Sequence, residues 1–188
     1  MSNFYIFGLT GLMGSGKSSL TDFFINDAGY KVIKLGEYLR SNMKVEEETD
    51  TINYLHNEAL KIKNNKKIKS LGQYYIKEIE ICRELNQILI VDSIRTEEDL
   101  KFFNMLSPNF KLIMILANQS IRRNRILTRQ RKNDPKNDEE FINHDNWEMR
   151  FGMSVILPVV NKFIINEGDI QHSIEKFARY IGEVKNEK

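Results

Sequence analysis

Residues 7–20 read FGLTGLMGSGKSSL, and the rest of the chain is best understood from this stretch outward. Its middle part, from Gly11 to Ser18, has the spacing Gly-x4-Gly-Lys-Ser that is typical of a phosphate-binding loop. An apolar run at 4–9 predicts a buried strand before the loop, and apolar residues with helical spacing follow over 18–28. Because a strand leads into the loop and a helix leads out of it, we predict phosphate binding and not a chance glycine-rich turn.

The loop offers both backbone and side-chain ligands. Its glycines let backbone N–H groups approach phosphate oxygens, and the helix N-terminus adds positive potential. We expect Lys17 to reach the β- and γ-phosphates of ATP and the Ser18 hydroxyl to ligate Mg²⁺. A dinucleotide-binding loop is the weaker alternative, because Ser19 stands where a third glycine belongs. The predicted nucleotide-binding residues are Gly11, Met13, Gly14, Ser15, Gly16, Lys17, Ser18 and Ser19.

Apolar runs alternate with helical patterns to the end of the chain. We expect four more strands, within 30–35, 87–92, 110–117 and 159–166, and the very apolar run at 87–92 as the central one. Strands that alternate with helices form parallel βαβ units. The predicted fold class is therefore α/β, a P-loop NTPase-type three-layer fold with a five-stranded parallel sheet and helices on both faces. Ligands of such sheets bind at the carboxyl ends of the strands.

Two segments, about 41–70 and 119–150, are longer and more polar than the connections of this fold require. Such segments are candidates for mobile covers over the ligand-binding edge of the sheet. We expect them to be lid-like inserts in a single domain that spans residues 1–188.

Composition limits the binding partners and the cellular location that we expect for the protein. The chain has 28 Lys and Arg residues against 26 Asp and Glu, and a net charge of +2 gives little support for nucleic-acid binding. The single Cys82 cannot form an internal disulfide. We expect no signal peptide, because the opening apolar run is short, and no apolar run within residues 1–188 approaches about 20 residues. We expect a cytoplasmic protein with no membrane partner.

Several classes of phosphate-binding protein need motifs that this chain lacks. A switch GTPase needs Asp-x-x-Gly, whereas Asp92 is followed by Ser93, Ile94 and Arg95. The guanine-reading motif is also missing, because the Asn-Lys pair at 161–162 has no aspartate after it. Motor and helicase ATPases often carry a glutamate beside the strand-end acid, where this chain has serine. The class of phosphate-binding protein that remains is a kinase for a small acceptor.

Three short motifs resemble adenylate kinases. LGEYLR at 35–40 is similar to their segment after the second strand, VDSIRT at 91–96 to their Asp-Gly-Phe-Pro-Arg-Thr, and the spacing Arg125-x3-Arg129 to the arginines at the base of their lid. The resemblance implies that Arg40 and Arg95 bind the phosphate of the acceptor. It implies that Arg125 and Arg129 contact the transferring phosphates, that Asp92 helps to hold Mg²⁺, and that Glu37 lies at the acceptor site. Planar guanidinium groups suit phosphate oxygens, which agrees with these roles.

The opening GLTGLMGSGKSSL resembles dephospho-CoA kinase. The latter half of the chain resembles an archaeal and bacterial family related to adenylate kinase and dephospho-CoA kinase, through VDSIRTEEDLKFF, NDPKNDEEF, DNWEMRFGMSVI and FIINEG. These resemblances imply one kinase domain, with an acceptor-binding insert at about 41–70 and a lid at about 119–150.

The residue at position 36 bears on the identity of the acceptor. Dephospho-CoA kinases carry an aspartate where this chain has Gly36, and glycine cannot accept a proton from a ribose hydroxyl. The sequence therefore favours a nucleoside monophosphate or a similar phosphate acceptor. Dephospho-CoA kinase-like transfer to a hydroxyl and a P-loop ATPase with a regulatory or nucleic-acid-associated role are the alternatives.

Simpler structural roles compete with some of these assignments. Arg40 could pair with Glu37 within a helix. Asp134, Asp138 and Asp145 favour a polar turn and a helix cap over a metal site. Trp147 with Phe151 favours packing under the lid over stacking on a base. On the basic helix expected at 120–131, the side that carries Arg125 and Arg129 also carries Arg122, whereas Arg123 and Arg131 are expected at the surface.

Overall fold

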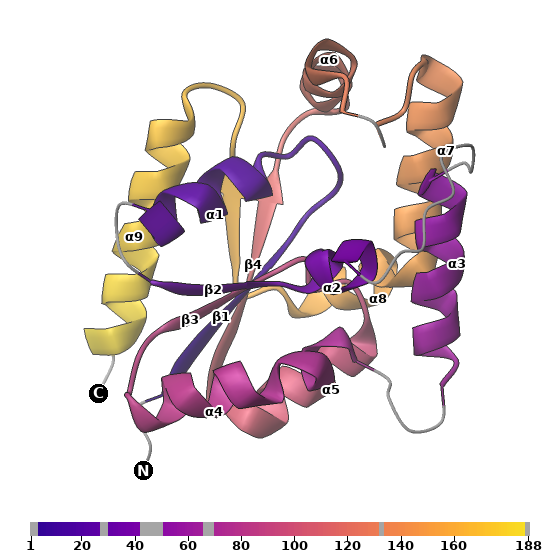
Figure 1. Ribbon diagram of the computed structural model, residues 1–188. Coiled ribbons are helices and arrows are strands. Elements are labelled where there is room, and N and C mark those ends of the chain that lie inside the picture. Colours follow the sequence, from indigo (N-terminus) through magenta and orange to yellow (C-terminus); the bar gives the residue numbers. More distant parts are fainter. Residues whose placement is uncertain (1–3, 27–29, 42–50, 66–69, 132–133, 187–188) are drawn as a thin grey trace.

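A computed structural model describes residues 4–26, 30–41, 51–65, 70–131 and 134–186 of the chain. Its centre is a sheet of five parallel strands in the order β2-β3-β1-β4-β5, which confirms the predicted α/β class (Figure 1). The strands are β1 Tyr5–Thr10, β2 Lys31–Lys34, β3 Leu89–Asp92, β4 Asn109–Leu116 and β5 Lys162–Ile165.

The prediction that residues 87–92 form the central strand is wrong. β1 occupies the middle of the sheet, and β3 lies between β1 and β2. Both strands are buried along their whole length. Because each has a neighbouring strand on both sides and helices above and below, burial gives them the same apolar pattern, and the pattern does not separate the middle strand from the one beside it.

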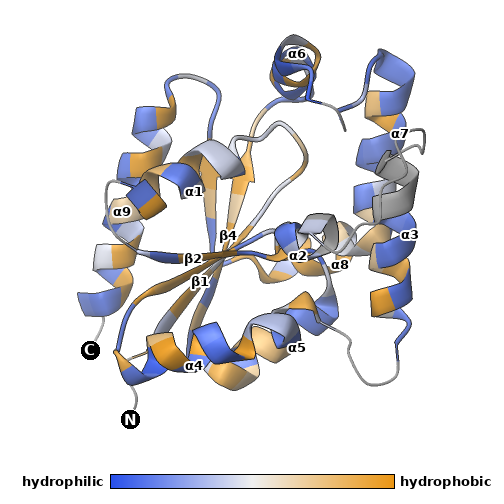
Figure 2. Cartoon of the chain, viewed as in Figure 1, coloured by the Kyte–Doolittle hydropathy of each residue, from blue (hydrophilic) through white to orange (hydrophobic). Residues whose placement is uncertain are grey.

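Helices cover the sheet on both faces, as the sequence predicts. On one face, α1 Lys17–Asn26 and α9 Ile170–Asn186 pack against alternate strand residues through buried side chains such as Phe24 and Phe177. On the other, α4 Ile76–Glu84 and α5 Glu97–Leu106 pack through Ile79 and Phe103. The two cores follow from the period of a strand, since Ile6 faces one of them and Phe7 the other. Figure 2 shows the hydrophobic residues gathered on the strands, with mixed hydropathy along the helices.

The remaining elements lie beyond the carboxyl edge of the sheet or border it. They are α2 Leu35–Ser41, α3 Thr51–Lys63, the 3-10 helix η1 Leu71–Tyr75, α6 Gln119–Arg129, α7 Asp138–Glu148, the π-helix η2 Met149–Met153, α8 Ser154–Ile156 and the 3-10 helix η3 Leu157–Val159. Figure 1 shows α3 and α7 standing beside each other, and stacked rings of His56 and Trp147 join them. No helix in the described part of the chain is long and apolar enough to cross a membrane.

Candidate active site

The loop between β1 and α1 is enclosed by distant parts of the chain. At Gly14 φ is +79°, and a Cβ there would lie 2.8 Å from the carbonyl oxygen of Arg122 in α6. A Cβ on Gly16, where φ is +100°, would collide with the side-chain amide of Asn166, which donates to the carbonyl of Ser15 at 2.8 Å. The glycines therefore meet two requirements at once, a left-handed backbone and close approach of α6 and the end of β5.

Lys17 lies at the first position of α1 with its side chain buried. Its ammonium donates to the carbonyl of Gly11 and, at 3.3 Å, to that of Leu12. Burial is the main cause that lowers the pKa of Lys17 to about 7; the positive charge of Arg95 lowers it further, and Asp92 opposes both. Burial and the neighbouring arginines thus disfavour the charged form of Lys17, and the phosphates of a bound ligand would favour it.

Asp92 ends β3 and is buried beside the loop. It is paired in register with Leu9 of β1, and its Oδ1 accepts from the Ser93 hydroxyl at 3.2 Å. Asp92 and Ser18 both line the cavity that Lys17 lines. A carboxylate and a hydroxyl are oxygen ligands of the kind that Mg²⁺ prefers, so these two residues fit the ion that the sequence predicts.

A cavity of about 660 Å³ extends from the loop across the carboxyl edge of the sheet. Its walls come from the loop, from α2 and α3, from the residues after β3, and from the region around α6 and α7. The predicted site residues that line it are Met13, Gly14, Gly16, Lys17, Ser18, Ser19, Glu37, Asp92, Arg95 and Arg129. The position agrees with the rule that parallel sheets bind ligands at the carboxyl ends of their strands.

The predicted arginines are placed differently from one another. Arg95 lines the cavity and forms an ion pair with Glu148. Arg129 also lines it, but both of its contacts go to Asp134, at 2.7 and 2.8 Å. Arg125 is not a cavity residue; its guanidinium lies 3.3 Å from the carbonyl oxygen of Gly14 and donates to it. Arg40 belongs to α2, and its side chain lies outside the described residues.

Arg131 is exposed, as the sequence predicts, and it also borders the cavity. α6 ends at Arg129, Gln130 takes a left-handed φ of 46°, and the chain then turns so that Arg131 borders the cavity. The N–H of Arg131 and the side chain of Arg129 both donate to Asp134. Although burial raises the pKa of Asp134, these hydrogen bonds bring it below its ordinary value. The carboxylate of Asp134 thus joins Arg129 and Arg131.

Two residues that hold the loop were not among the predicted site residues: Arg122, which was expected only to share the helix side of Arg125 and Arg129, and Glu148. The guanidinium of Arg122 grips the carboxylate of Asp145 with two hydrogen bonds, at 2.8 and 2.5 Å, and donates a third to the carbonyl of Met13 at 3.0 Å. Asp145 is therefore an ion-pair partner and not a cap or turn residue. Glu148 is 2% exposed and accepts from the N–H of Met13 at 3.0 Å. No local sequence pattern predicts these contacts, because Arg122 and Asp145 are 23 positions apart and Met13 and Glu148 are 135 positions apart.

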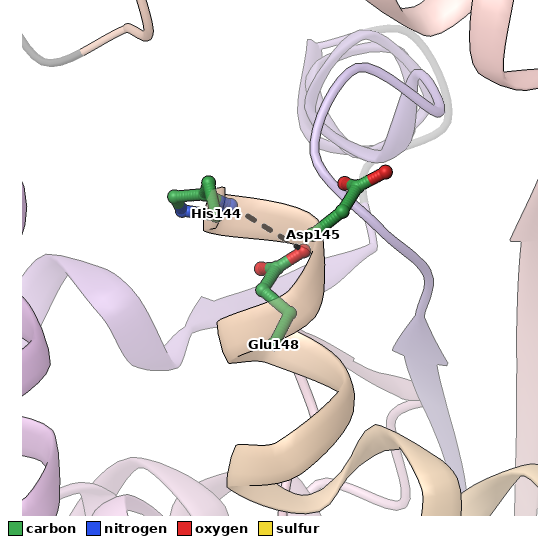
Figure 3. A group of neighbouring side chains, drawn as sticks. All are labelled: His144, Asp145 and Glu148. Atoms are coloured by element: carbon green, nitrogen blue, oxygen red, sulfur yellow. Dashed lines mark ion pairs between the residues drawn. The ribbon is translucent and has the colours of Figure 1, made fainter. Parts of the chain in front are cut away.

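Figure 3 shows His144, Asp145 and Glu148 projecting from α7, and their potential metal-ligand atoms lie within 4.8 Å of one another. The carboxylates are already neutralised, that of Asp145 by Arg122 and that of Glu148 by Arg95. Burial, followed by the charge of Arg95, lowers the pKa of His144 to about 3, so this imidazole is neutral at physiological pH. We therefore interpret the group as a clamp for two arginines and not as a metal centre.

An aromatic wall closes the cavity on the side of α3. The ring of Trp147 stacks on His56, with centroids 3.5 Å apart and planes at 6°, and on Phe151 at 4.6 Å and 15°. All three rings line the cavity, together with Ala59 and Ile62 of α3. The packing role expected for Trp147 and Phe151 holds, and the same rings also present an apolar surface to a ligand.

A parallel sheet with a glycine-rich phosphate-binding loop after its central strand and an acid at the end of the neighbouring strand defines a P-loop nucleotide-binding protein with the α/β fold of small-molecule kinases. The chain belongs to the family AAA_17, described as an AAA domain, whose model matches residues 10–142.

Relatives extend the similarity to nearly the whole chain. A UPF0200 protein of Methanothermobacter thermautotrophicus is 25% identical over 182 residues, which are 95% of this chain and 90% of the relative. A UPF0200 protein of Pyrococcus furiosus is 27% identical over 178 residues, 92% of this chain and 95% of the relative.

Solved structures share the fold. A sugar kinase from Janibacter has a TM-score of 0.54 at 10% identity and covers 95% of each chain. Shikimate kinase from Bacteroides thetaiotaomicron has a TM-score of 0.56 at 14% identity and covers 95% of this chain and 98% of its own. These likenesses support the kinase-like fold, and the narrower resemblance to adenylate kinase and dephospho-CoA kinase stays a prediction.

Proposed function

We propose that this protein is a Mg²⁺-dependent kinase that transfers the γ-phosphoryl group of ATP to a small acceptor of the nucleoside monophosphate type. One observation carries the proposal: Lys17, Asp92 and Arg95 line the same cavity as the apolar wall formed by α3 and Trp147. A phosphate-binding end and a ring-binding end in one cavity suit a donor and an acceptor that meet there.

The donor would be bound by the loop. Backbone N–H groups and Lys17 would hold the β- and γ-phosphates, and Ser18 and Asp92 would hold Mg²⁺. When bound, Mg²⁺ neutralises charge on the phosphates and fixes their orientation. Lys17 must move its ammonium from the loop carbonyls to the phosphates, which exchanges neutral acceptors for anionic ones and so favours binding.

The acceptor would lie between Arg95, Glu37 and the aromatic wall. Phosphoryl transfer depends mainly on positioning and on charge neutralisation, and an ionised phosphate acceptor needs no general base. The absence of a carboxylate at Gly36 is compatible with such an acceptor. The apolar rings of Trp147 and Phe151 suit the base of a nucleotide, whereas Arg95 suits its phosphate.

One observation favours the alternative of a hydroxyl acceptor. Glu148 already compensates the charge of Arg95, so a phosphate gains less from this arginine than from an unpaired one. A neutral hydroxyl acceptor avoids that competition. The acceptor screen described next separates the two possibilities.

The proposed function is tested by following ADP release from ATP and Mg²⁺ in the presence of separate candidate acceptors. The panel contains the nucleoside and deoxynucleoside monophosphates and dephospho-CoA, with water alone and a mixed RNA and DNA sample as references. We expect one nucleotide acceptor to raise ADP release well above the water rate. Stimulation by nucleic acid alone would instead identify a nucleic-acid-associated ATPase and contradict the proposal.

Arg95→Met tests the acceptor site. We expect kcat/KM for the acceptor to fall by about 10- to 100-fold, because a charged hydrogen bond to the reacting phosphate is lost. The Kd for ATP should change by less than about threefold, since the loop and Lys17 remain. Arg179→Met, an exposed arginine of α9, is the matched control. Equal losses in ATP and acceptor binding would place Arg95 at the donor instead.

The depressed pKa of Lys17 predicts a pH dependence of nucleotide binding. Without ligand this lysine is mostly uncharged at pH 8, because its pKa is about 7. Bound phosphates favour the charged form, so binding at pH 8 should take up close to one proton and at pH 6 almost none. Affinity should therefore weaken above pH 7, by up to about tenfold per pH unit.

Calorimetric titration with ADP in two buffers of different ionisation enthalpy measures this uptake. Lys17→Arg is the control, because arginine stays charged and should bind ADP at pH 8 with little proton uptake. Uptake in the wild type that equals that of Lys17→Arg would contradict the assignment.

A further inference from the structure

The backbone of Met13 in the phosphate-binding loop is held on both sides of its Cα by the helices α6 and α7. Its N–H donates to Oε2 of Glu148 at 3.0 Å. Its carbonyl accepts from Arg122 at 3.0 Å, and Arg122 is in turn fixed by Asp145 of α7. The segment expected to be a mobile lid thus contacts the loop through buried polar groups.

Glu148 connects this loop to the arginine after β3. While Oε2 accepts from Met13, Oε1 forms the ion pair with Arg95. The side chain of Glu148 is 1% exposed and that of Arg95 is 30% exposed, so the arginine keeps a face toward the cavity. One buried carboxylate therefore spans the distance between the proposed donor and acceptor sites.

The backbone around Arg95 is held by the same region of the chain. A Cβ on Gly152, one turn after Glu148, would collide with the carbonyl oxygen of Arg95. The π-helix η2 consequently packs directly against the main chain of Arg95, and Glu148 fixes its side chain. Residues 148–152 therefore contact both the main chain and the side chain of Arg95, whose N–H also donates to Oδ2 of Asp99 in α5 at 3.3 Å.

The groups around Glu148 leave its charge available to Arg95. His144 Nδ1 lies 4.0 Å from Oε2 of Glu148, and this imidazole is neutral at physiological pH because burial and Arg95 lower its pKa to about 3. An arginine with a fixed, charge-assisted partner loses less conformational entropy when it meets a phosphate than a freely rotating one. Preorganisation of this kind lowers the barrier of a reaction that depends on positioning.

We propose that Glu148 is a positioning residue for phosphoryl transfer, which holds the Arg95 guanidinium at a set distance from the phosphate-binding loop through the N–H of Met13. The assignment rests on the proposed function, because Arg95 acts on phosphate only if transfer occurs in this cavity. Glu148 itself touches neither substrate; it acts through Arg95 and Met13.

A double-mutant cycle between Glu148→Gln and Arg95→Met tests the proposal. Glutamine keeps an oxygen for the Met13 N–H but removes the charge that orients Arg95. We expect Glu148→Gln to lower kcat by about 10- to 100-fold, with less than a threefold change in the Kd for ATP. In the Arg95→Met background the same change should cost less than about twofold. Equal losses in both backgrounds would show that Glu148 acts independently of Arg95 and would overturn the proposal.

A second measurement needs no acceptor. The mobility of the Arg95 side chain is followed through its Nε–H signal by NMR, in the wild type, in Glu148→Gln and in Glu139→Gln, an exposed glutamate of the same helix. We expect Arg95 to become mobile only in Glu148→Gln. An unchanged Arg95 signal would overturn the positioning role. If no acceptor in the panel is phosphorylated but Arg95 responds in this way, the proposed function fails and the link from Glu148 to Arg95 stands.

Discussion

Lys17→Ala is expected to abolish phosphoryl transfer, with a fall in kcat of about 1,000-fold or more. Lys17 is the buried lysine at the start of α1, and its ammonium lies within the phosphate-binding loop, where it donates to the carbonyl of Gly11. Transfer of a phosphoryl group depends on stabilising charge that develops on the phosphate oxygens, and a preorganised donor in an enclosed site contributes about 100- to 1,000-fold. Alanine removes both the donor and its charge.

The loss should come without unfolding. Burial opposes the charge of Lys17 and lowers the pKa of this lysine from 10.5 to about 7. The charge therefore makes folding less favourable below pH 7, and this free-energy cost of folding decreases as the pH rises toward 10.5. Removing the charge should therefore leave the melting temperature close to that of the wild type or raise it. Lys31→Ala, an exposed lysine of β2, is the control and should keep full activity. ATP turnover that persists in Lys17→Ala would exclude a loop-based kinase mechanism.

Arg122→Met is expected to lower the free energy of unfolding by about 3–5 kcal/mol. The side chains of Arg122 and Asp145 are 6% and 11% exposed, and two hydrogen bonds join them. Methionine fills a similar volume but leaves the carboxylate of Asp145 buried without a counter-charge. Breaking such a pair by removing one partner is strongly destabilising, because an uncompensated charge remains in the interior. Denaturation with urea, followed by circular dichroism, measures the change.

The neighbouring arginine supplies a matched control. Arg123 pairs with Asp138 at the surface, where the side chains are 44% and 60% exposed, and Arg123→Met should cost less than about 1 kcal/mol. The double variant Arg122→Met with Asp145→Leu should recover most of the stability, because it removes both charges. If Arg122→Met cost no more than Arg123→Met, the Arg122–Asp145 pair would not be the stabilising contact described here.

The arginines illustrate the limit of motif-based prediction. The resemblance to adenylate kinases predicts that Arg125 and Arg129 contact the transferring phosphates, and this stays a prediction. In the structure Arg129 pairs with Asp134, and Arg125 donates to the carbonyl of Gly14. The charge and the helix were both predictable, but the partner of each arginine depends on how α6 packs on the loop, which no local pattern encodes.

Strand order has a similar explanation. The existence of five strands and their parallel arrangement follow from apolar runs that alternate with helices, because each run is long enough for one strand and each connection is long enough for a crossover. The position of β1 in the middle, with β3 beside it, depends on which buried strands pair with each other. Both have the same apolar pattern, so only their contacts distinguish them.

The phosphate-binding chemistry could be predicted from the sequence because it is local. Gly11 to Ser18 are consecutive, and a strand before them and a helix after them are enough to predict a phosphate-binding loop with Lys17 at the start of the helix. The link between Met13, Glu148 and Arg95 required the tertiary structure. Glu148 lies 135 positions from Met13, and the two meet only because α7 packs against the loop and Gly152 lets η2 approach the backbone of Arg95.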